Sequence, residues 1–317
     1  MVLVIPPSLL TATLGRAPGF CVYGGPGLYK THAVHTLPPP ILHLDVGEGG
    51  ASSILPWLRR SRLASQREWW VYNDDDRQSF IELLDDATRK LILYKPRPYI
   101  DTVSFDNTSF EDFDRFTEIV ANFDVVQYNS LVLDSLHEFA ELSKTNARGA
   151  GNYDKLMTEV AHSWIRAQER SAQKLRKLRN YRDSGVFIYM TGSEDIAKDY
   201  VQSPLEKRPT GSQAPEAYSI RGTVDLPGKL AGALSHIPDV LCHARLINGR
   251  PVWITEPEML PGGGAHWDAK DRFGRLERYE TPNFRVLTEK IYGKEAMRAI
   301  YGKAMADVVN PASSAGE

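Results

Sequence analysis

The stretch Tyr-Gly-Gly-Pro-Gly-Leu-Tyr-Lys-Thr, residues 23–31, decides the fold that we expect for this chain. It follows the short apolar run 19–22 and leads into a second apolar run, Ile-Leu-His-Leu-Asp, at residues 41–45. An apolar strand, a glycine-rich turn closed by Lys-Thr and a second buried strand are typical of a loop that cradles nucleotide phosphates. The backbone N–H groups of such a loop converge on the phosphates, and the N-terminus of the following helix adds positive potential.

The loop positions have expected roles in binding nucleotide phosphates and Mg²⁺. Lys30 is expected to reach the terminal phosphates, and the Thr31 hydroxyl to hold Mg²⁺. Tyr29 stands where a second glycine usually precedes the lysine, and because that position has little steric room we expect a conformational cost. The alternative is a glycine-rich turn that binds no ligand. The remaining cofactor-binding positions are Gly24, Gly25, Pro26, Gly27 and Leu28.

Composition and charge narrow the classes of protein that fit the chain. At 317 residues, with 42% hydrophobic and 25% charged residues, the chain is typical of a globular protein with a full core. The net charge of −2 means that any nucleic-acid surface must be local. Cys21 and Cys242 lie in strand-like runs without metal-ligand spacing, which predicts buried thiols in a reducing compartment. No apolar run approaches the ~18 residues of a membrane span, so we expect a cytoplasmic protein without membrane contacts.

Apolar strand-like runs alternate with helical patterns along the chain, which predicts an α/β fold with a mainly parallel sheet and helices on both faces. We expect a single domain over residues 1–309, with a hairpin-like excursion at about 91–106 and a basic loop at about 191–222. The tail 310–317 is small and polar, and is expected to be disordered. Strands are predicted at 20–23, 41–45, 69–73, 130–134, 185–190, 240–246 and 251–255. Helices are predicted at 53–63, 77–90, 110–122, 136–144, 153–181 and near 294–309.

Three acidic residues at predicted strand ends are candidates for the chemistry of the site. Asp134 ends an apolar strand and is expected in the Mg²⁺ shell beside the loop, although the residue could instead only begin the next helix. Asp45 and Glu48 follow the second strand, where a carboxylate can orient an attacking water. We prefer Glu48 as the water-activating group and Asp45 as the second choice; the alternative is an acidic, glycine-rich turn.

Polar and basic residues later in the chain complete the candidate set. Thr191 and Ser193 follow the strand at 185–190 and could sense the terminal phosphate, or simply begin a solvated loop. The helix around 167–181 is strongly basic, which most often indicates a solvated face. A basic loop beyond it could follow a nucleic-acid strand. Its candidate nucleic-acid contacts are Lys198, Lys207, Arg208 and Arg221.

Two compact basic turns, at 226–230 and 267–275, could supply a cation to the phosphates of a neighbouring subunit. The candidate trans-acting residues are Lys229, Lys270 and Arg272. Ordinary surface turn chemistry is the alternative interpretation.

Taken in order, these segments resemble the short RecA-like ATPases of phages, AAA-family ATP-binding proteins grouped with Sak-type single-strand annealing proteins. The corresponding stretches are 24–31, 44–50, 131–135, 226–229 and 269–272, so the resemblance spans roughly residues 18–290. It implies a RecA-like P-loop NTPase core, ATP with Mg²⁺, single-stranded DNA as partner and assembly of identical subunits into rings or filaments. A phage single-strand-binding protein is a further candidate partner, and the location would be the host cytoplasm. Tyr29 and the inserted Gly47 are departures from the family pattern and leave the rate of hydrolysis open.

Three functions therefore compete at this point. The first is an ATPase that couples hydrolysis to single-stranded DNA binding and assembly in phage recombination or annealing. The second is a non-hydrolysing nucleotide- and DNA-binding scaffold whose loop is degenerate at Tyr29. The third is a helicase-type motor, which we rank last because no additional loading or nuclease domain is evident.

Overall fold

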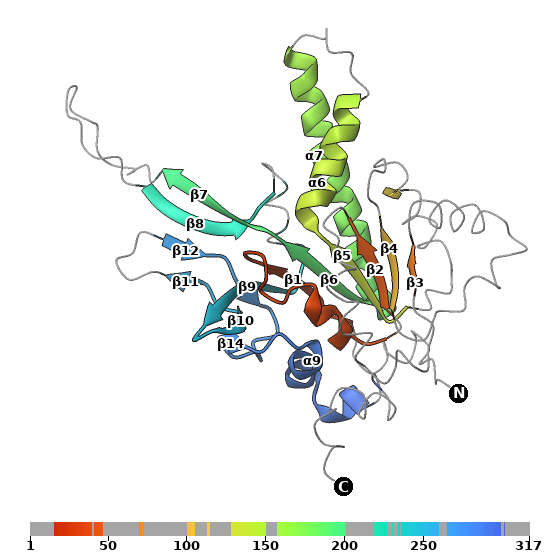
Figure 1. Ribbon diagram of the computed structural model, residues 1–317, viewed down its shortest axis with the longest axis vertical. Helices are drawn as coiled ribbons and strands as arrows, with labels where there is room; N and C mark the ends of the chain where they lie inside the picture. The colour runs from red at the N-terminus through yellow and green to blue at the C-terminus, as the bar shows by residue number, and fades with distance from the viewer. Residues whose placement is uncertain are drawn as a thin grey trace, which may run out of the picture.

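The computed structural model of the protein describes the glycine-rich loop, most of the sheet and the helices that cover it (Figure 1). The described residues are 16–39, 41–46, 70–72, 100–104, 113–114, 128–149, 157–200, 218–226, 230, 234, 236–259, 265–298 and 301.

A ten-stranded, mostly parallel sheet forms the centre of the described fold, in the order β14-β10-β9-β1-β6-β5-β2-β4-β3, with β13 paired to β9. The strands from β9 to β3 in this order are mutually parallel, whereas β10, β13 and β14 pair antiparallel. The parallel strands are β1 (Gly19–Tyr23), β2 (Ile41–Asp45), β3 (Trp70–Tyr72), β4 (Ile100–Ser104), β5 (Ser130–Asp134), β6 (Phe187–Gly192) and β9 (Val240–Ile247). The antiparallel ones are β10 (Arg250–Ile254), β13 (Lys270–Asp271) and β14 (Tyr279–Glu280).

Helices cover both faces of this sheet, because each central strand is apolar on both sides. Along β5, Leu131 and Leu133 face one core, whereas Val132 faces the other, as the two-residue period of a strand requires. The first core packs against α6 (Leu136–Gly149) and α7 (Met157–Asn180). The second packs against the 3₁₀ helix η1 (His32–Thr36) and α9 (Phe284–Tyr292). The predicted α/β fold with helices on both faces is therefore confirmed.

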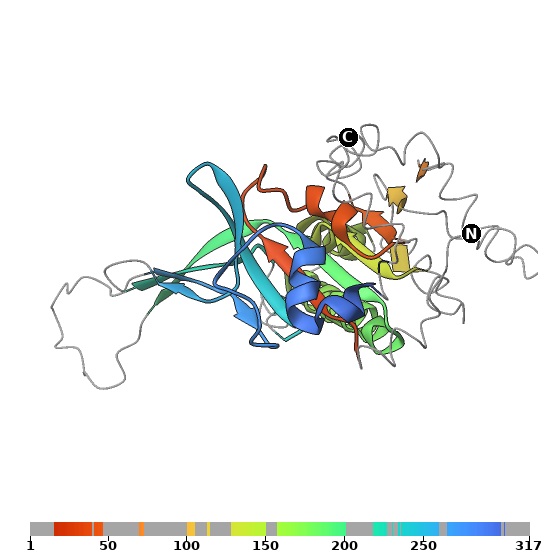
Figure 2. The ribbon, with the colours of Figure 1, turned by 90° about the horizontal axis from the view of Figure 1, so that it is seen from below.

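A second, four-stranded sheet projects from the body of the described fold (Figures 1 and 2). Its strands, in spatial order, are β11 (Glu258–Met259), β12 (Ala265–Trp267), β8 (Tyr218–Val224) and β7 (Glu194–Tyr200). The expectation of a basic loop over 191–222 is wrong for the described part, since β7 and β8 pair antiparallel over their full length. The polar composition misled us, because the hydrogen bonds of this ribbon satisfy the backbone whatever the polarity of its side chains.

The other predicted elements agree with the structure to different extents. The predicted strands at 20–23, 41–45, 130–134, 240–246 and 251–255 are confirmed, and the long helix predicted at 153–181 is confirmed over the described residues Met157–Asn180. Residues 100–104 differ from the expected excursion, because they form a strand of the main sheet that is parallel to β2. Helix α9 was missed, and residues 294–298 and 301 are helical where the last helix was expected. The ranges 53–63, 77–90, 91–99 and 310–317 lie outside the described residues, and only 113–114 of the helix at 110–122 are described.

Both cysteines are buried free thiols, as the sequence predicts. Burial raises the pKa of Cys21 to about 12, so its thiol stays protonated at neutral pH. Within the described part of the chain, no helix combines the length and the apolar character needed to cross a bilayer.

Candidate phosphate-loop site

The glycine-rich loop leaves the carboxyl end of β1 and passes close to its neighbour β9. Gly24 has a φ of +151°, and a Cβ at this position would lie 2.6 Å from the carbonyl oxygen of Ala244. Gly27 has a φ of +74° and has open space around its Cα. The close approach to β9 therefore requires glycine at Gly24, and the left-handed backbone favours glycine at Gly27.

Tyr29 adopts the conformation for which a glycine is usually chosen. Its φ is +63°, in the left-handed region, and its side chain is 49% exposed. The Tyr29 carbonyl accepts a hydrogen bond from the Ala33 N–H at 3.1 Å, and the ring meets the edge of His32 at 5.1 Å between centroids. The backbone of the loop thus keeps its turn, while the ring lies at the surface and does not fill the loop.

The expected α-helix after the loop is a 3₁₀ helix of five residues, η1. Leu37 is extended, with φ −71° and ψ 157°, because it precedes Pro38, and this ends the helix at Thr36. A single short turn of this kind has little dipole, so the expected contribution of a helix N-terminus to phosphate binding is wrong. Anion binding here would depend on the loop N–H groups and Lys30.

Lys30 curls back over the start of the loop. Its Nζ donates hydrogen bonds to the carbonyl oxygens of Gly24 and Gly25, both at 2.8 Å. Its own carbonyl accepts a hydrogen bond from the hydroxyl of Tyr189 at 2.8 Å, which ties the loop to β6. The ammonium group is therefore held across the loop, where a phosphate bound by the main chain would meet it.

Thr31 contacts Asp134 directly, although the two residues are 103 positions apart. The Thr31 hydroxyl donates to Asp134 Oδ2 at 2.7 Å, and the Thr191 hydroxyl donates to Asp134 Oδ1. The imidazole Nε2 of His43 lies 3.3 Å from Asp134 Oδ2. Asp134 is thus the hub of a buried polar cluster built from the loop and three adjacent strands, β6, β5 and β2.

The cluster keeps Asp134 ionised despite its burial. Burial raises the pKa of Asp134, but hydrogen bonding and electrostatic attraction to His43, with hydrogen bonds from Thr191 and Thr31, bring it below its usual 3.8. An ionised carboxylate that accepts the Thr31 proton leaves the lone pairs of that hydroxyl available to a cation. The donor set therefore fits Mg²⁺, which in phosphate sites takes few protein ligands and retains waters.

The described residues contain no group of three or more His, Cys, Asp or Glu that could hold a metal ion. A Mg²⁺ ion at Thr31 would accordingly depend on phosphate oxygens and water for most of its ligands. The expected assignments of Thr31 and Asp134 to Mg²⁺ remain predictions that this geometry supports.

Of the two candidate bases, only Asp45 is described. It ends β2, pairs in register with Asp134 and is 1% exposed. Two carboxylates thus end adjacent strands at the edge of the sheet where the loop begins. Glu48 lies outside the described residues, so our preference for it over Asp45 remains a prediction.

The two sensor candidates lie at the end of β6. Thr191 belongs to the Asp134 cluster and is fully buried. Ser193 stands between β6 and β7, where its carbonyl accepts a hydrogen bond from the Asp225 N–H at 2.9 Å. The structure therefore brings Thr191 to the loop, and Ser193 lies at the junction with the second sheet.

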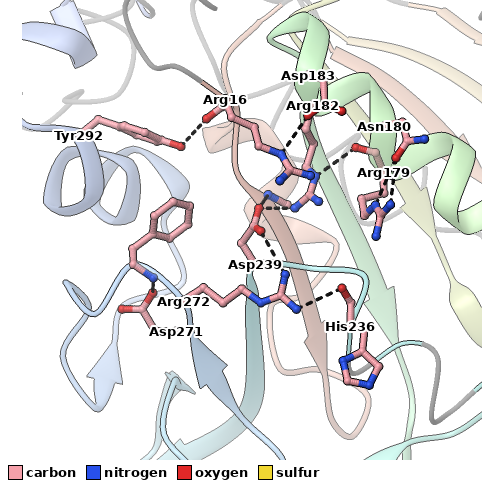
Figure 3. Close-up of polar contacts among 12 residues, drawn as sticks. Arg16, Arg179, Asn180, Arg182, Asp183, His236, Asp239, Asp271, Arg272 and Tyr292 are labelled. Carbon is pink, nitrogen blue, oxygen red and sulfur yellow. Dashed lines mark hydrogen bonds and ion pairs between the residues drawn. The ribbon is translucent and has the colours of Figure 1, made fainter.

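The two described trans-acting candidates, Lys270 and Arg272, lie away from the glycine-rich loop. Lys270 pairs with Leu241 and Asp271 with Val240, near the beginning of β9, whereas the loop begins at the other end of β1. Arg272 donates to the carbonyl of His236 at 3.2 Å and lies 3.7 Å from Asp239 (Figure 3). Burial and the nearby Arg272 lower the pKa of Lys270 to about 8. Lys229 lies outside the described residues.

The DNA-contact candidates are only partly described. Lys198 and Arg221 lie on β7 and β8, where Lys198 pairs with Ile220 and Arg221 with Ala197. Lys207 and Arg208 lie outside the described residues. The two described positions therefore belong to the projecting sheet, and the loop expected there is replaced by strands.

Sequence reasoning missed His43 and Tyr189, which hold Asp134 and Lys30 respectively. For His43 a signal existed: Ile41, His43 and Asp45 alternate along β2, so the histidine shares a strand face with a candidate catalytic acid. Tyr189 gave no such signal, because a tyrosine in an apolar strand is common in cores.

Comparisons with known proteins leave this geometry as the main guide to function. No protein-family model matches the chain, and no characterised protein matches it significantly.

Proposed function

We propose that this chain is a RecA-like P-loop ATPase that binds ATP with Mg²⁺ in the loop at residues 24–31. The observation that carries the proposal is the 2.7 Å hydrogen bond between Thr31 and Asp134, which joins the loop to the acid at the end of β5. The loop also lies at the carboxyl end of β1. In the sheet, β2, the strand that follows the loop in the chain, lies to one side of β1, and β9 lies beside β1 on the other side. Open parallel sheets bind ligands at such a switch point.

Each residue of the site has one task in this proposal. The loop N–H groups and the Lys30 ammonium bind the phosphates and offset their negative charge. Thr31 would hold Mg²⁺ and Asp134 would accept the hydroxyl proton of Thr31, fixing the direction of its lone pairs. Bound Mg²⁺ would neutralise charge that develops on the transferred phosphoryl group. Glu48, or Asp45 as second choice, would orient the attacking water.

Single-stranded DNA and further copies of the chain are the partners that we propose, for recombination or strand annealing in a phage. The exposed face of α7 supports a polyanionic partner, because its cations are locally dense in a chain with a net charge of −2. These exposed cations are Arg166, Arg170, Arg176 and Lys177. ATP binding would favour the assembled, DNA-bound state, and hydrolysis would release it.

The direct test is calorimetric titration of ATP with Mg²⁺ into the wild type and the Lys30→Ala variant. Because charge-assisted hydrogen bonds contribute about 1.5–3 kcal/mol, we expect ATP affinity to fall about 10- to 100-fold. Lys294→Ala is the matched control, since this lysine is exposed and pairs only weakly with Glu289 at 3.8 Å. A Lys30→Ala protein with wild-type ATP affinity and DNA-stimulated turnover would refute the proposal.

A second candidate, a non-hydrolysing nucleotide- and DNA-binding scaffold, is favoured by one observation, the left-handed backbone of Tyr29. The loop retains its turn at a conformational cost. Such a loop can bind the phosphates of a nucleotide without being optimal for transferring the terminal phosphoryl group. Steady-state ATPase measurements with and without single-stranded DNA separate the two functions. ATP binding and salt-sensitive DNA binding without any turnover would favour the scaffold.

A further inference from the structure

We propose that His43 is a positioning residue that holds the Asp134 carboxylate toward Thr31 and thereby sets the Mg²⁺ requirement of ATP binding. The inference rests on the proposed function and adds to it a residue outside the loop and outside the expected acids. The contact that carries the inference joins the His43 imidazole to Asp134 at 3.3 Å, so His43 would act on Thr31 through Asp134.

The placement of His43 follows from the register of the sheet. His43 pairs with Val132 and Asp45 with Asp134, so His43 lies two residues before the level of the acid, on the same strand face. Its imidazole therefore approaches Asp134 from within the sheet, and Thr31 approaches from the loop. Both groups meet the same oxygen, Oδ2, at 3.3 Å and 2.7 Å.

The three contacts leave the carboxylate one orientation. Oδ1 accepts from Thr191 on β6, and Oδ2 accepts from Thr31 and faces His43 on β2. His43 is 0% and Asp134 2% exposed, so no water replaces a lost partner without entering the core. Without His43, Thr31 would still hold Oδ2 from the loop side, but no imidazole would hold it from within the sheet. The acceptor of the Thr31 hydroxyl would then no longer be fixed in place.

Support of this kind has a defined effect at metal sites. Outer-shell residues, which hold the groups around a metal ion without touching the ion, typically change metal affinity about 10- to 100-fold when they are replaced. His43 would be such a residue, because it holds Asp134, the acceptor of the Thr31 hydroxyl. A purely structural histidine would instead lower the stability of the protein and leave the Mg²⁺ requirement unchanged. The Mg²⁺ dependence of ATP binding therefore separates a positioning role from a packing role.

The experiment measures ATP binding by calorimetry over a range of Mg²⁺ concentrations and in EDTA, with thermal unfolding as a check on folding. The variants are His43→Leu, which removes the donor, His43→Gln, whose amide can donate at similar reach, and His43→Asn, whose amide is too short. His243→Leu is the matched control, since His243 is also buried within a strand of the main sheet, β9, but faces Glu194 rather than Asp134.

We expect His43→Leu and His43→Asn to need about 10- to 100-fold more Mg²⁺ for half-maximal binding, with unchanged binding in EDTA. His43→Gln should stay within a few fold of the wild type, and His243→Leu should match the wild type. If His43→Leu does not fold, the contrast between the glutamine and asparagine variants decides. A wild-type Mg²⁺ requirement in the leucine or asparagine variant overturns the role of His43 alone, whereas a wild type that binds no ATP overturns the proposed function.

Discussion

Replacing Tyr29 tests whether the glycine-rich loop contains a strained residue at the position before its lysine. At a φ of +63°, a residue with a Cβ carries a penalty of roughly 1–2 kcal/mol that glycine avoids. Glycine loses about 0.5–1 kcal/mol more than alanine through the entropy of the unfolded chain. The difference predicts that the Tyr29→Gly variant is about 0.5–1 kcal/mol more stable than the Tyr29→Ala variant.

The comparison between glycine and alanine is chosen because both remove the ring. The tyrosine side chain is half exposed and contacts His32, and loss of that contact cancels between the two variants. Val286 is the matched reference, since it is an exposed position of the regular helix α9. Val286 lies in the first turn of α9, so the interior penalty of about 1 kcal/mol is an upper bound; the order should reverse there, with Val286→Gly less stable than Val286→Ala.

Urea unfolding followed by circular dichroism gives the free energy of unfolding for the four variants. The strained left-handed backbone is supported if Tyr29→Gly is more stable than Tyr29→Ala while the order of the glycine and alanine variants is the opposite at position 286. If Tyr29→Ala were as stable as Tyr29→Gly, or more so, the tyrosine would not be strained. The departure of the loop from the glycine pattern would then have no energetic meaning.

Two further predictions concern the opposite end of the sheet. Asp239→Ala should lower the free energy of unfolding in urea by about 3–5 kcal/mol, because it leaves the buried Arg182 without the carboxylate that it contacts. Asp183→Ala is the control: it breaks an exposed pair with Arg16 and should change the free energy of unfolding by less than about 1 kcal/mol. The pKa of Lys270 is lowered from 10.5 to about 8, so the unfolded chain binds more protons over this interval and stability should rise with pH across it. A Lys270→Met protein should lack this rise in thermal melts between pH 8 and 10.5; an unchanged profile would contradict the assignment.

The sequence predicted those residues of the candidate site whose pattern lies within a few neighbouring positions of the chain. Lys30 and Thr31 were identified by their position after a glycine-rich turn, and Asp134 by its place at the end of an apolar run. The polar stretch after β6 misled us, because side-chain polarity does not report whether a backbone finds an antiparallel partner. His43 is buried in an apolar strand, and a single histidine there usually indicates only a packed core.

The sequence by itself determined the central strands of the main sheet, the helical layer of α6 and α7 and the glycine-rich loop, because hydrophobic period and turn residues act within a few positions of one another. Only the tertiary structure decided the order of the strands, the second, four-stranded sheet and the convergence of His43, Thr31 and Thr191 on Asp134. Contacts such as those of Asp134 with His43 and of Gly19 with Asp239 join residues 91 and 220 positions apart. Register in the folded sheet sets such contacts, and no local pattern encodes them.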